Sequence, residues 1–291
     1  MINGFLNINK AADMTSHDVV NRVRRILNTK KIGHAGTLDP FATGVLPVAV
    51  GKATKFIEYL ANCDKSYRGE IFFGIETSTG DITGEIINQY QNFKMPPRNL
   101  IDEVLKSFVG TIQQTPPKYS AIKINGQKAY ELARKNVEFN LPSREVKIYN
   151  LAIVEQSETT LTVDIDCSKG TYIRALAVDI GKKFDTLATL KSLQRTRVGK
   201  FSIADSVTIE ELQNIGDEAI IKVDSCLEHL PCFYLPPYRL KAFCSGLSTR
   251  VDENFDEGSI FRVYVNNEFV GTGKIIDGEI KVAKSYKTYL T

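Results

Sequence analysis

Asp39 is the residue whose setting most suggests chemistry. It lies in the stretch GHAGTLDPFATGVLP, residues 33–47, and is the only carboxylate between Asp18 and Glu58, a span with seven Lys and Arg residues. Glycines at positions 33, 36 and 44 would let the backbone approach a ligand closely. An acid surrounded by cations should keep a low pKa and stay ionised, which suits a nucleophile. Because an Asp-Pro pair also commonly begins a turn, the sequence leaves both interpretations open.

The sequence near Asp39 argues against two other kinds of site, a carboxylate pair and a phosphate-binding loop. A glycosidase or nucleosidase would need a second acid beside Asp39, and the neighbouring sequence offers none. The run GVLPVAVGKAT resembles a phosphate-binding loop, but six residues separate Gly44 from Gly51. Ala53 also stands where that loop needs a Ser or Thr to bind Mg²⁺, so we reject this interpretation.

A metal site is a further possibility that the residue types raise. Cys226, His229, Cys232 and Cys244 could supply four ligands, but their spacing is not that of a known zinc module. We interpret them as buried thiols and an unrelated histidine.

The bulk composition is that of a soluble globular protein. The 291 residues are 43% hydrophobic and 24% charged, with net charge +3 and no apolar run of the ~18–20 residues that span a bilayer. The first residues lack the apolar core of a signal peptide, and five cysteines without a CxxC pair suit a reducing cytoplasm. Basic residues gather at 22–31, 118–147 and 182–200, either as solvated faces or as a surface that contacts phosphates.

Periodicity predicts a mixture of strands and helices in the first 230 residues. Alternating apolar residues predict a strand at 4–10, and a capping box from Thr15 to Asp18 predicts a helix after it. The Gly- and Pro-rich stretch 33–51 should contain no regular helix before about position 53, and its part at 33–47 should be a rigid loop. The remaining expected elements are strands at 67–77 and 161–167, helices at 98–109 and 171–183, and an irregular basic stretch at 115–147 with a short helix at 129–135.

The composition of the sequence changes near Leu230. LPCFYLPP reads as a proline-punctuated linker, followed by the strand candidates SIFRVYV, EFVGTGKII and EIKVA with Asn-Asn and Asp-Gly turns between them. We therefore predict an α+β protein with one domain at 1–232 and a small β-rich domain at 233–291.

Several motifs together resemble one family. KIGHAGTLDPFATGVLPVAVGKATK, residues 31–55, resembles the signature of the TruB family of tRNA pseudouridine-55 synthases. GFLNINKAADMTSHDVV is similar to that family's N-terminal motif, although Ala11 stands in place of the usual Pro. KSYRGEIFFG, PPKYSAIKINGQKAYELAR and CSKGTYIRALAVDIG resemble its tyrosine, thumb and arginine motifs. The resemblance covers residues 3–230.

This resemblance implies an RNA-modifying isomerase that flips uridine 55 out of the T loop of tRNA and converts it to pseudouridine. It also implies a mixed, largely antiparallel sheet of the pseudouridine synthase type, a thumb insertion at about 118–142 that orders on RNA, and a PUA-like C-terminal domain. The reaction would need no cofactor and no metal. The expected protein is a cytoplasmic monomer that binds the T arm of tRNA and no membrane.

The resemblance also assigns catalytic roles. Asp39 would be the nucleophile, attacking either C6 of the uracil or C1′ of the ribose. Arg174 would pair with Asp39 and hold it ionised, whereas its periodicity alone would also fit a surface helix residue. Tyr67 would stack on the uracil with its hydroxyl near C5, for the final proton removal.

Further residues would bind the substrate. Tyr172 and Leu193 would line the uridine pocket, and His34 would fill the space that the flipped base leaves in the RNA. Lys10 would support the pocket without reacting. A non-catalytic tRNA-binding or tRNA-folding protein on the same scaffold is the alternative.

Overall fold

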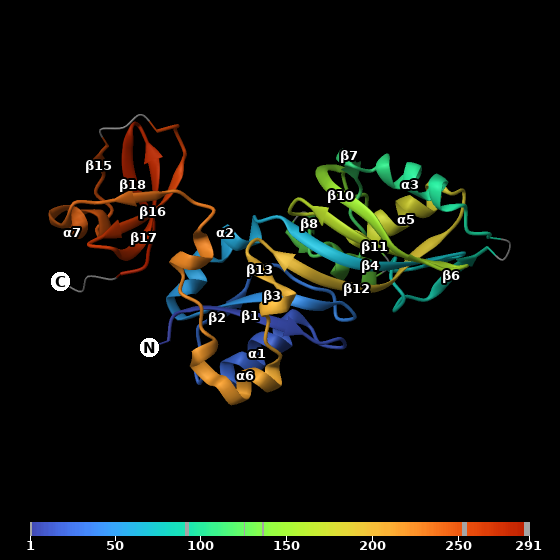
Figure 1. The fold of residues 1–291 in the computed structure, drawn as a ribbon, viewed down its shortest axis with the longest axis horizontal. Coiled ribbons are helices and arrows are strands. Elements are labelled where there is room, and N and C mark those ends of the chain that lie inside the picture. Colours follow the sequence, from blue (N-terminus) through green and yellow to red (C-terminus); the bar gives the residue numbers. More distant parts are fainter. Residues whose placement is uncertain (1, 91–92, 125, 136, 252–254, 288–291) are drawn as a thin grey trace.

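The computed structural model describes residues 2–90, 93–124, 126–135, 137–251 and 255–287. Figure 1 shows an elongated molecule, with a small C-terminal sheet at one end and a large sheet through the rest. No helix within those ranges is both long and apolar enough to cross a membrane.

The large sheet carries the site. Within the described residues it has nine strands in the order β1-β3-β12-β4-β11-β10-β7, with β2 beside β3 and β13 beside β12. All neighbours are antiparallel except β3 and β12, which run parallel. Its strands are β1 (Gly4–Lys10), β2 (Ile32–His34), β3 (Thr43–Val50), β4 (Lys65–Phe73), β7 (Gly110–Gln114), β10 (Arg144–Gln156), β11 (Thr160–Cys167), β12 (Ala188–Val198) and β13 (Phe201–Ser202).

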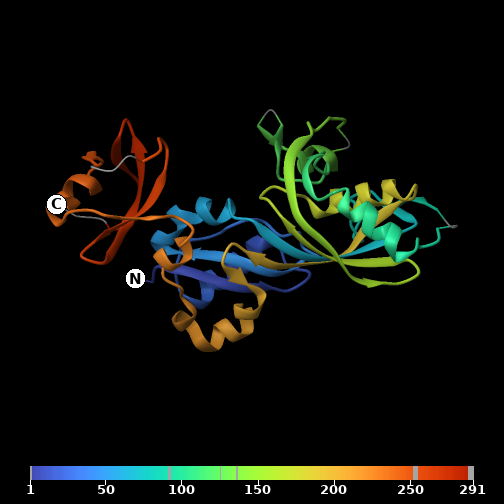
Figure 2. The ribbon, with the colours of Figure 1, turned by 45° about the horizontal axis from the view of Figure 1, so that its top comes forward.

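Helices surround this sheet, as Figure 2 shows from a second direction. The α-helices are α1 (Ser16–Ile26), α2 (Ile57–Ala61), α3 (Arg98–Lys106), α4 (Ala129–Arg134), α5 (Ile173–Lys183), α6 (Ile209–Ile215) and α7 (Leu240–Cys244). Short 3₁₀ helices are η1 (Gly51–Phe56), η2 (Ile203–Asp205), η3 (Gly216–Ala219), η4 (Asp224–Leu227) and η5 (Pro237–Arg239). The mixed sheet and its helices confirm the predicted α+β class.

Local sequence signals explain why these helices begin where they do. The side chains of Thr15 and Asp18 form the predicted capping box at the start of α1, which buries Val19, Val20 and Val23. The helices predicted at 98–109, 129–135 and 171–183 are confirmed as α3, α4 and α5, each with slightly different ends.

Three local predictions are wrong. Part of the loop predicted at 33–47 is strand, because β2 and β3 extend into it and leave only residues 35–42 irregular. Strand β3 is buried almost throughout, so it lacks alternation, and its proline argues against a central strand. The strand predicted at 67–77 breaks at Gly74, whose φ of 91° suits glycine. Strand β10 already begins at position 144, inside the stretch expected to be irregular.

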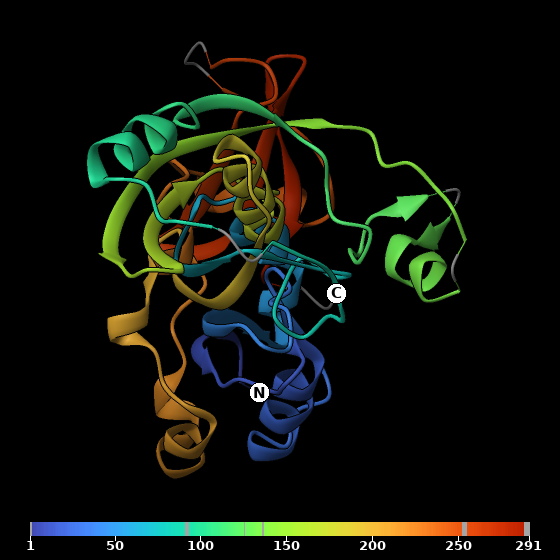
Figure 3. The same ribbon diagram turned by 90° about the vertical axis from the view of Figure 1, so that its right-hand side faces the viewer.

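Two hairpins branch from the large sheet. The first pairs β5 (Ile75–Thr77) with β6 (Ile86–Gln89), and the second pairs β8 (Lys123–Ile124) with β9 (Gln127–Lys128). Figure 3 shows the second hairpin and α4 projecting together from the body. This projection is the segment expected as the thumb, and both its ends leave the large sheet, at β7 and β10.

The C-terminal sheet has the order β14-β16-β17-β18-β15. Its strands are β14 (Cys232–Tyr234), β15 (Thr249–Arg250), β16 (Ile260–Val265), β17 (Glu268–Ile276) and β18 (Glu279–Ser285). The three strand candidates and both turns are confirmed, since Asn266, Asn267 and Asp277 have positive φ. LPCFYLPP, however, is more than a linker, because β14 within it pairs with β16.

Candidate active site

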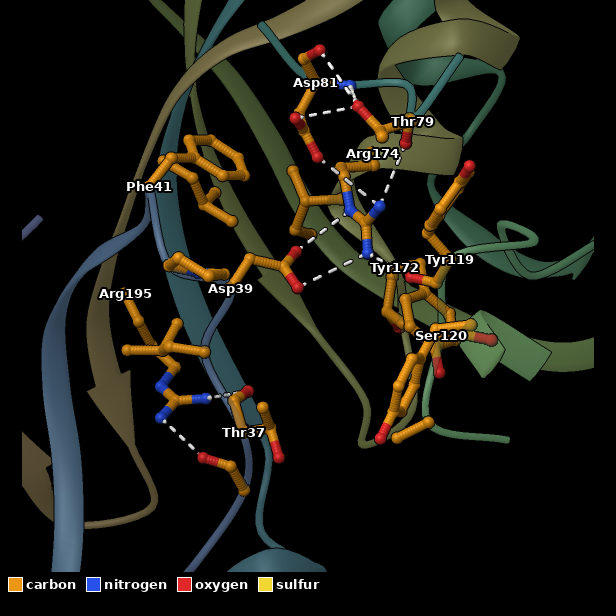
Figure 4. Close-up of a pocket in the computed structure, with 18 of the residues that line it drawn as sticks. Thr37, Asp39, Phe41, Thr79, Asp81, Tyr119, Ser120, Tyr172, Arg174 and Arg195 are labelled. Carbon is orange, nitrogen blue, oxygen red and sulfur yellow. Dashed lines mark hydrogen bonds and ion pairs between the residues drawn. The ribbon is translucent and has the colours of Figure 1, made fainter. Parts of the chain in front are cut away.

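Asp39 lies in the loop between β2 and β3. These strands pair antiparallel, so residues 35–42 leave the sheet and return to it within a short distance. The amide of Ala42 donates to the carbonyl of Asp39 at 3.1 Å, which closes a turn. Asp39 therefore begins a turn, as the Asp-Pro pair predicted, and also presents its side chain beside Arg174 (Figure 4).

Arg195 of β12 holds this loop through hydrogen bonds to its backbone carbonyls. Its guanidinium donates to the carbonyls of Val45 at 2.7 Å, Gly36 at 3.1 Å and Thr37 at 3.4 Å. Gly44 makes this approach possible, because its φ is +99° and an added Cβ would lie 2.2 Å from the carbonyl oxygen of Arg195. The loop that carries Asp39 is thus held by an arginine that the sequence did not single out.

The guanidinium of Arg174 joins two carboxylates. Its Nε lies 2.9 Å from Oδ2 of Asp39, and its Nη2 donates to Oδ1 of Asp39 at 3.4 Å. On the other side, Nη1 lies 3.4 Å from Oδ2 of Asp81 (Figure 4). The carbonyls of Thr79, at 2.9 Å, and Tyr119, at 2.8 Å, accept its remaining hydrogen bonds. Arg174 is 5% exposed, so the surface-helix interpretation of it is wrong.

Asp81 is the second acid that the sequence did not reveal. Its Oδ1 accepts from the hydroxyl of Thr79 at 2.9 Å, and from the amide and hydroxyl of Thr83 at 3.0 and 2.5 Å. Because Asp81 is far from Asp39 along the chain, no local pattern connects them. The expectation that Asp39 has no neighbouring acid is therefore wrong in space, although it holds along the sequence.

This arrangement also changes the electrostatics expected for Asp39. Although 36% of its side chain is open to the cavity, protein atoms surround the carboxylate, and this burial raises its pKa above the ordinary value. Arg174 opposes the rise, whereas the negative charge of Asp81 adds to it. The predicted low pKa is wrong, and Arg174 is the main group that favours the ionised form.

A cavity of about 730 Å³ opens beside Asp39. Tyr67 on β4, Leu193 on β12 and Tyr172 before α5 all line it, so the structure brings these three predicted residues together with Asp39 and Arg174. Tyr67 is 7% exposed, and burial raises the pKa of its hydroxyl.

Gln114 holds the backbone of Tyr172, and Arg144 lies over its ring. Its backbone N–H donates to Oε1 of Gln114 at 2.8 Å, and its carbonyl accepts from Nε2 of the same side chain at 3.1 Å. The guanidinium of Arg144 lies 4.7 Å from the centroid of its ring. Gln114 and Arg144 end β7 and begin β10, so the base of the projecting segment is tied to the start of α5.

The projecting segment covers part of the cavity. Besides the carbonyl of Tyr119, the side chains of Ser120, Tyr130 and Arg134 lie among the lining residues. Ser120 is 5% exposed, and its hydroxyl has no hydrogen-bond partner among the residues that the structure describes. This segment therefore places a buried hydroxyl without a described partner beside the cavity.

His34 and Lys10 lie outside the described lining of this cavity. His34 is half-buried on β2, where burial lowers its pKa. Lys10 ends β1 and is fully buried, and its ammonium donates to the carbonyls of Ala11, Met14 and Pro40 at 2.8, 2.7 and 3.0 Å. Burial lowers its pKa to about 8. Through Pro40, Lys10 supports the loop beside Asp39.

Comparisons with known proteins identify the family to which the sequence is related. The TruB family pseudouridylate synthase N-terminal domain matches residues 24–173, and the tRNA pseudouridylate synthase B C-terminal domain matches residues 174–230. The tRNA pseudouridine synthase B of Clostridium kluyveri is 41% identical over 98% of this chain and all of its own length. That of Bacillus pumilus is 45% identical over 79% of this chain and 78% of its own.

Solved structures show the same fold. A chain in the crystal structure of a Cbf5-Nop10-Gar1 complex has a TM-score of 0.78 and 26% identity, covering 98% of this chain and 85% of its own. A chain of an H/ACA RNP bound to a substrate RNA containing 2'-deoxyuridine has a TM-score of 0.77 and 24% identity, with the same coverage. The chain belongs to the TruB family of pseudouridylate synthases.

Proposed function

We propose that this chain converts uridine 55 in the T loop of tRNA to pseudouridine, with Asp39 as the nucleophile. The family membership and the names of the relatives support a tRNA pseudouridine synthase. The observation that carries the assignment of Asp39 is its partly exposed carboxylate, which is gripped at both oxygens by the buried guanidinium of Arg174.

The reaction breaks the bond between N1 and C1′ and forms a bond between C5 and C1′, with no net gain or loss of atoms. A fixed, ionised carboxylate at a cavity edge can attack either C6 of the uracil or C1′ of the ribose, and both routes remain open. Arg174 keeps Asp39 charged and aimed through charge-assisted hydrogen bonds.

A cavity of about 730 Å³ is deep enough to take a nucleotide that has left its stack. Tyr67 would stack on the uracil and accept the C5 proton, with Tyr172 and Leu193 as further walls. His34, outside this cavity, would fill the gap in the RNA, and Lys10 would support the loop. We propose that the segment 118–142 closes on the T arm.

The remaining assignments follow from the same function. We propose that residues 1–232 form the catalytic domain and 233–291 a PUA-like domain that also contacts tRNA. The basic stretches 22–31, 118–147 and 182–200 would contact phosphates, as RNA is read largely by its backbone and shape. A monomer that works in the cytoplasm without a cofactor would suffice.

The test replaces Asp39 by Asn, which keeps its shape and removes its charge. Asp39→Asn should bind tRNA but form no pseudouridine, measured by tritium release from C5-labelled tRNA and by mapping of the modified position. Asp164→Asn is a matched control, because Asp164 forms an exposed ion pair with Arg68 on the opposite strand. Normal turnover by Asp39→Asn would contradict the proposal, and tRNA binding without turnover by the wild type would favour a non-catalytic protein.

A further inference from the structure

Arg195 occupies a special position in the large sheet. It is the direct cross-strand partner of Tyr67 on β4 and, on the other side of β12, of Gly44 on β3. Directly opposed residues of an antiparallel pair place their side chains on the same face of the sheet. Arg195 therefore lies beside the loop that carries Asp39 (Figure 4) and, through the strand pairing, beside the tyrosine assigned to the final proton transfer.

The charge of Arg195 is buried without a counter-ion. Its side chain is 1% exposed, and among the described residues it forms no ion pair. Its three hydrogen bonds go to the neutral carbonyls of Val45, Gly36 and Thr37. An uncompensated buried charge is costly, and carbonyl dipoles offset only part of that cost. Burying a hydrophobic side chain at this position would cost less free energy than burying a charge. The presence of the charge therefore calls for a functional explanation.

The hydroxyl of Tyr67 is the group that this charge can serve. Burial raises the pKa of Tyr67, and Cys167 on β11 and Asp39 in its loop add to that rise. Arg195 is the cation that opposes them. Its field is felt by the neighbouring Lys65 as well, where burial and the charge of Arg195 lower the pKa to about 8.

We propose that Arg195 is a positioning residue that stabilises the anionic oxygen of Tyr67, so that Tyr67 can accept the proton from C5 of the isomerised base. The same guanidinium holds the carbonyls of the loop that aims Asp39. One side chain thus holds the loop of the nucleophile Asp39 and stabilises the ionised form of the base Tyr67. This inference rests on the function proposed above.

The proton transfer balances within the isomerisation. After C5 has bonded to C1′, its proton moves to the Tyr67 oxygen, and the electron pair of the C5–H bond restores the double bond between C5 and C6. N1, which no longer carries the sugar, ends with a proton taken from solvent. The Tyr67 phenol then returns its proton to water before the next turnover.

The experiment measures single-turnover formation of pseudouridine against pH for the wild type and Arg195→Gln. A general base contributes about 10²- to 10⁴-fold, which Tyr67→Phe should show at all pH values. Arg195→Gln should lose about tenfold or more near neutral pH and recover as pH rises, because more Tyr67 then ionises without help. A deuterium isotope effect from 5-deuterouridine should grow in this variant. Arg68→Gln, which removes an exposed cation of β4 paired with Asp164, should leave the pH profile in place.

A second measurement separates this role from a structural one. Incorporation of a fluorinated, more acidic tyrosine at position 67 should restore the rate of Arg195→Gln near neutral pH. In the wild type it should move the rising limb of the profile, where Tyr67 ionises, to lower pH, and this measurement does not depend on the folding of any Arg195 variant. If Arg195→Gln does not fold, Arg195→Lys is compared by the same criteria.

The outcomes are distinct. A loss by Arg195→Gln that is equal at every pH, or a wild-type profile that fluorinated tyrosine does not move, would overturn the role of Arg195. Absence of pseudouridine from the wild type would instead overturn the proposed function.

Discussion

Replacing Arg174 by Gln should weaken both the fold and the catalytic step. The pair between Arg174 and Asp81 is 5% exposed on each side, and breaking a pair so buried costs about 3–5 kcal/mol. The pair with Asp39 contributes less, because 36% of that side chain is open to water, which screens the charge. With one amide donor retained, we expect a loss of about 3 kcal/mol in unfolding free energy, which lowers the melting temperature by about 6–12 °C.

The pH dependence of Arg174→Gln follows from the sign of the Asp39 shift. Burial and Asp81 already raise the pKa of Asp39, and without Arg174 it should rise further. The nucleophile is then less ionised near neutral pH, so the acidic limb of activity should move to higher pH. Stability carries the same signature, because a raised carboxyl pKa costs stability as pH rises through it. The stability deficit should therefore shrink in acid.

The assay is single-turnover tritium release from C5-labelled tRNA between acidic and alkaline pH, with tRNA binding measured in parallel. We expect a loss of about 10²- to 10³-fold, as for removal of one charge-stabilising donor. Adding Asp81→Asn should move the acidic limb back towards lower pH, because Asp81 raises the pKa of Asp39. A loss that is equal at every pH, with no response to Asp81→Asn, would refute this reasoning.

Three further predictions concern the residues that support the site. Gly44→Ala should unfold or inactivate the protein, because the new Cβ would lie 2.2 Å from the carbonyl of Arg195, and circular dichroism with an activity assay checks this. Gln114→Leu should cost about 1–3 kcal/mol by denaturant unfolding, because the N–H of Tyr172 loses its partner and its carbonyl keeps only the amide of Leu176. Lys10→Met should flatten the rise of stability between pH 8 and 10.5, where folded Lys10, with a pKa of about 8, binds fewer protons than unfolded Lys10.

The sequence predicts best those elements whose signals are local. The capping box from Thr15 to Asp18 and the Asn-Asn turn at 266–267 each act within a few residues, and both are confirmed. Strand β3 was missed because burial on both faces removes the alternation that marks a strand. Strand β14 has no local signal, because its partner among the described residues, β16, lies about thirty residues further along the chain.

The site residues also differ in whether the sequence alone reveals them. Asp39 stands out by its surroundings in the sequence, and the family resemblance supplied Arg174, Tyr67, Tyr172 and Leu193, all of which line one cavity. Asp81 and Arg195 had no local signal, because their importance comes from contacts with residues distant in sequence. Arg195 was counted only as one cation in a basic stretch, whereas it is fully buried.

Asp81 is a second acid close to Asp39 in space, so the absence of one in the neighbouring sequence does not by itself exclude a carboxylate-pair hydrolase. Such enzymes need one acid that can hold a proton and face the scissile bond. Asp81 is poorly placed for this, because three donors occupy its Oδ1 and Arg174 faces its Oδ2, so both of its oxygens already have partners in the protein. Of these two acids, Asp39 has the more exposed carboxylate, 36% against 5% for Asp81. The two acids therefore act as one nucleophile and one anchor, held apart by the guanidinium that both share.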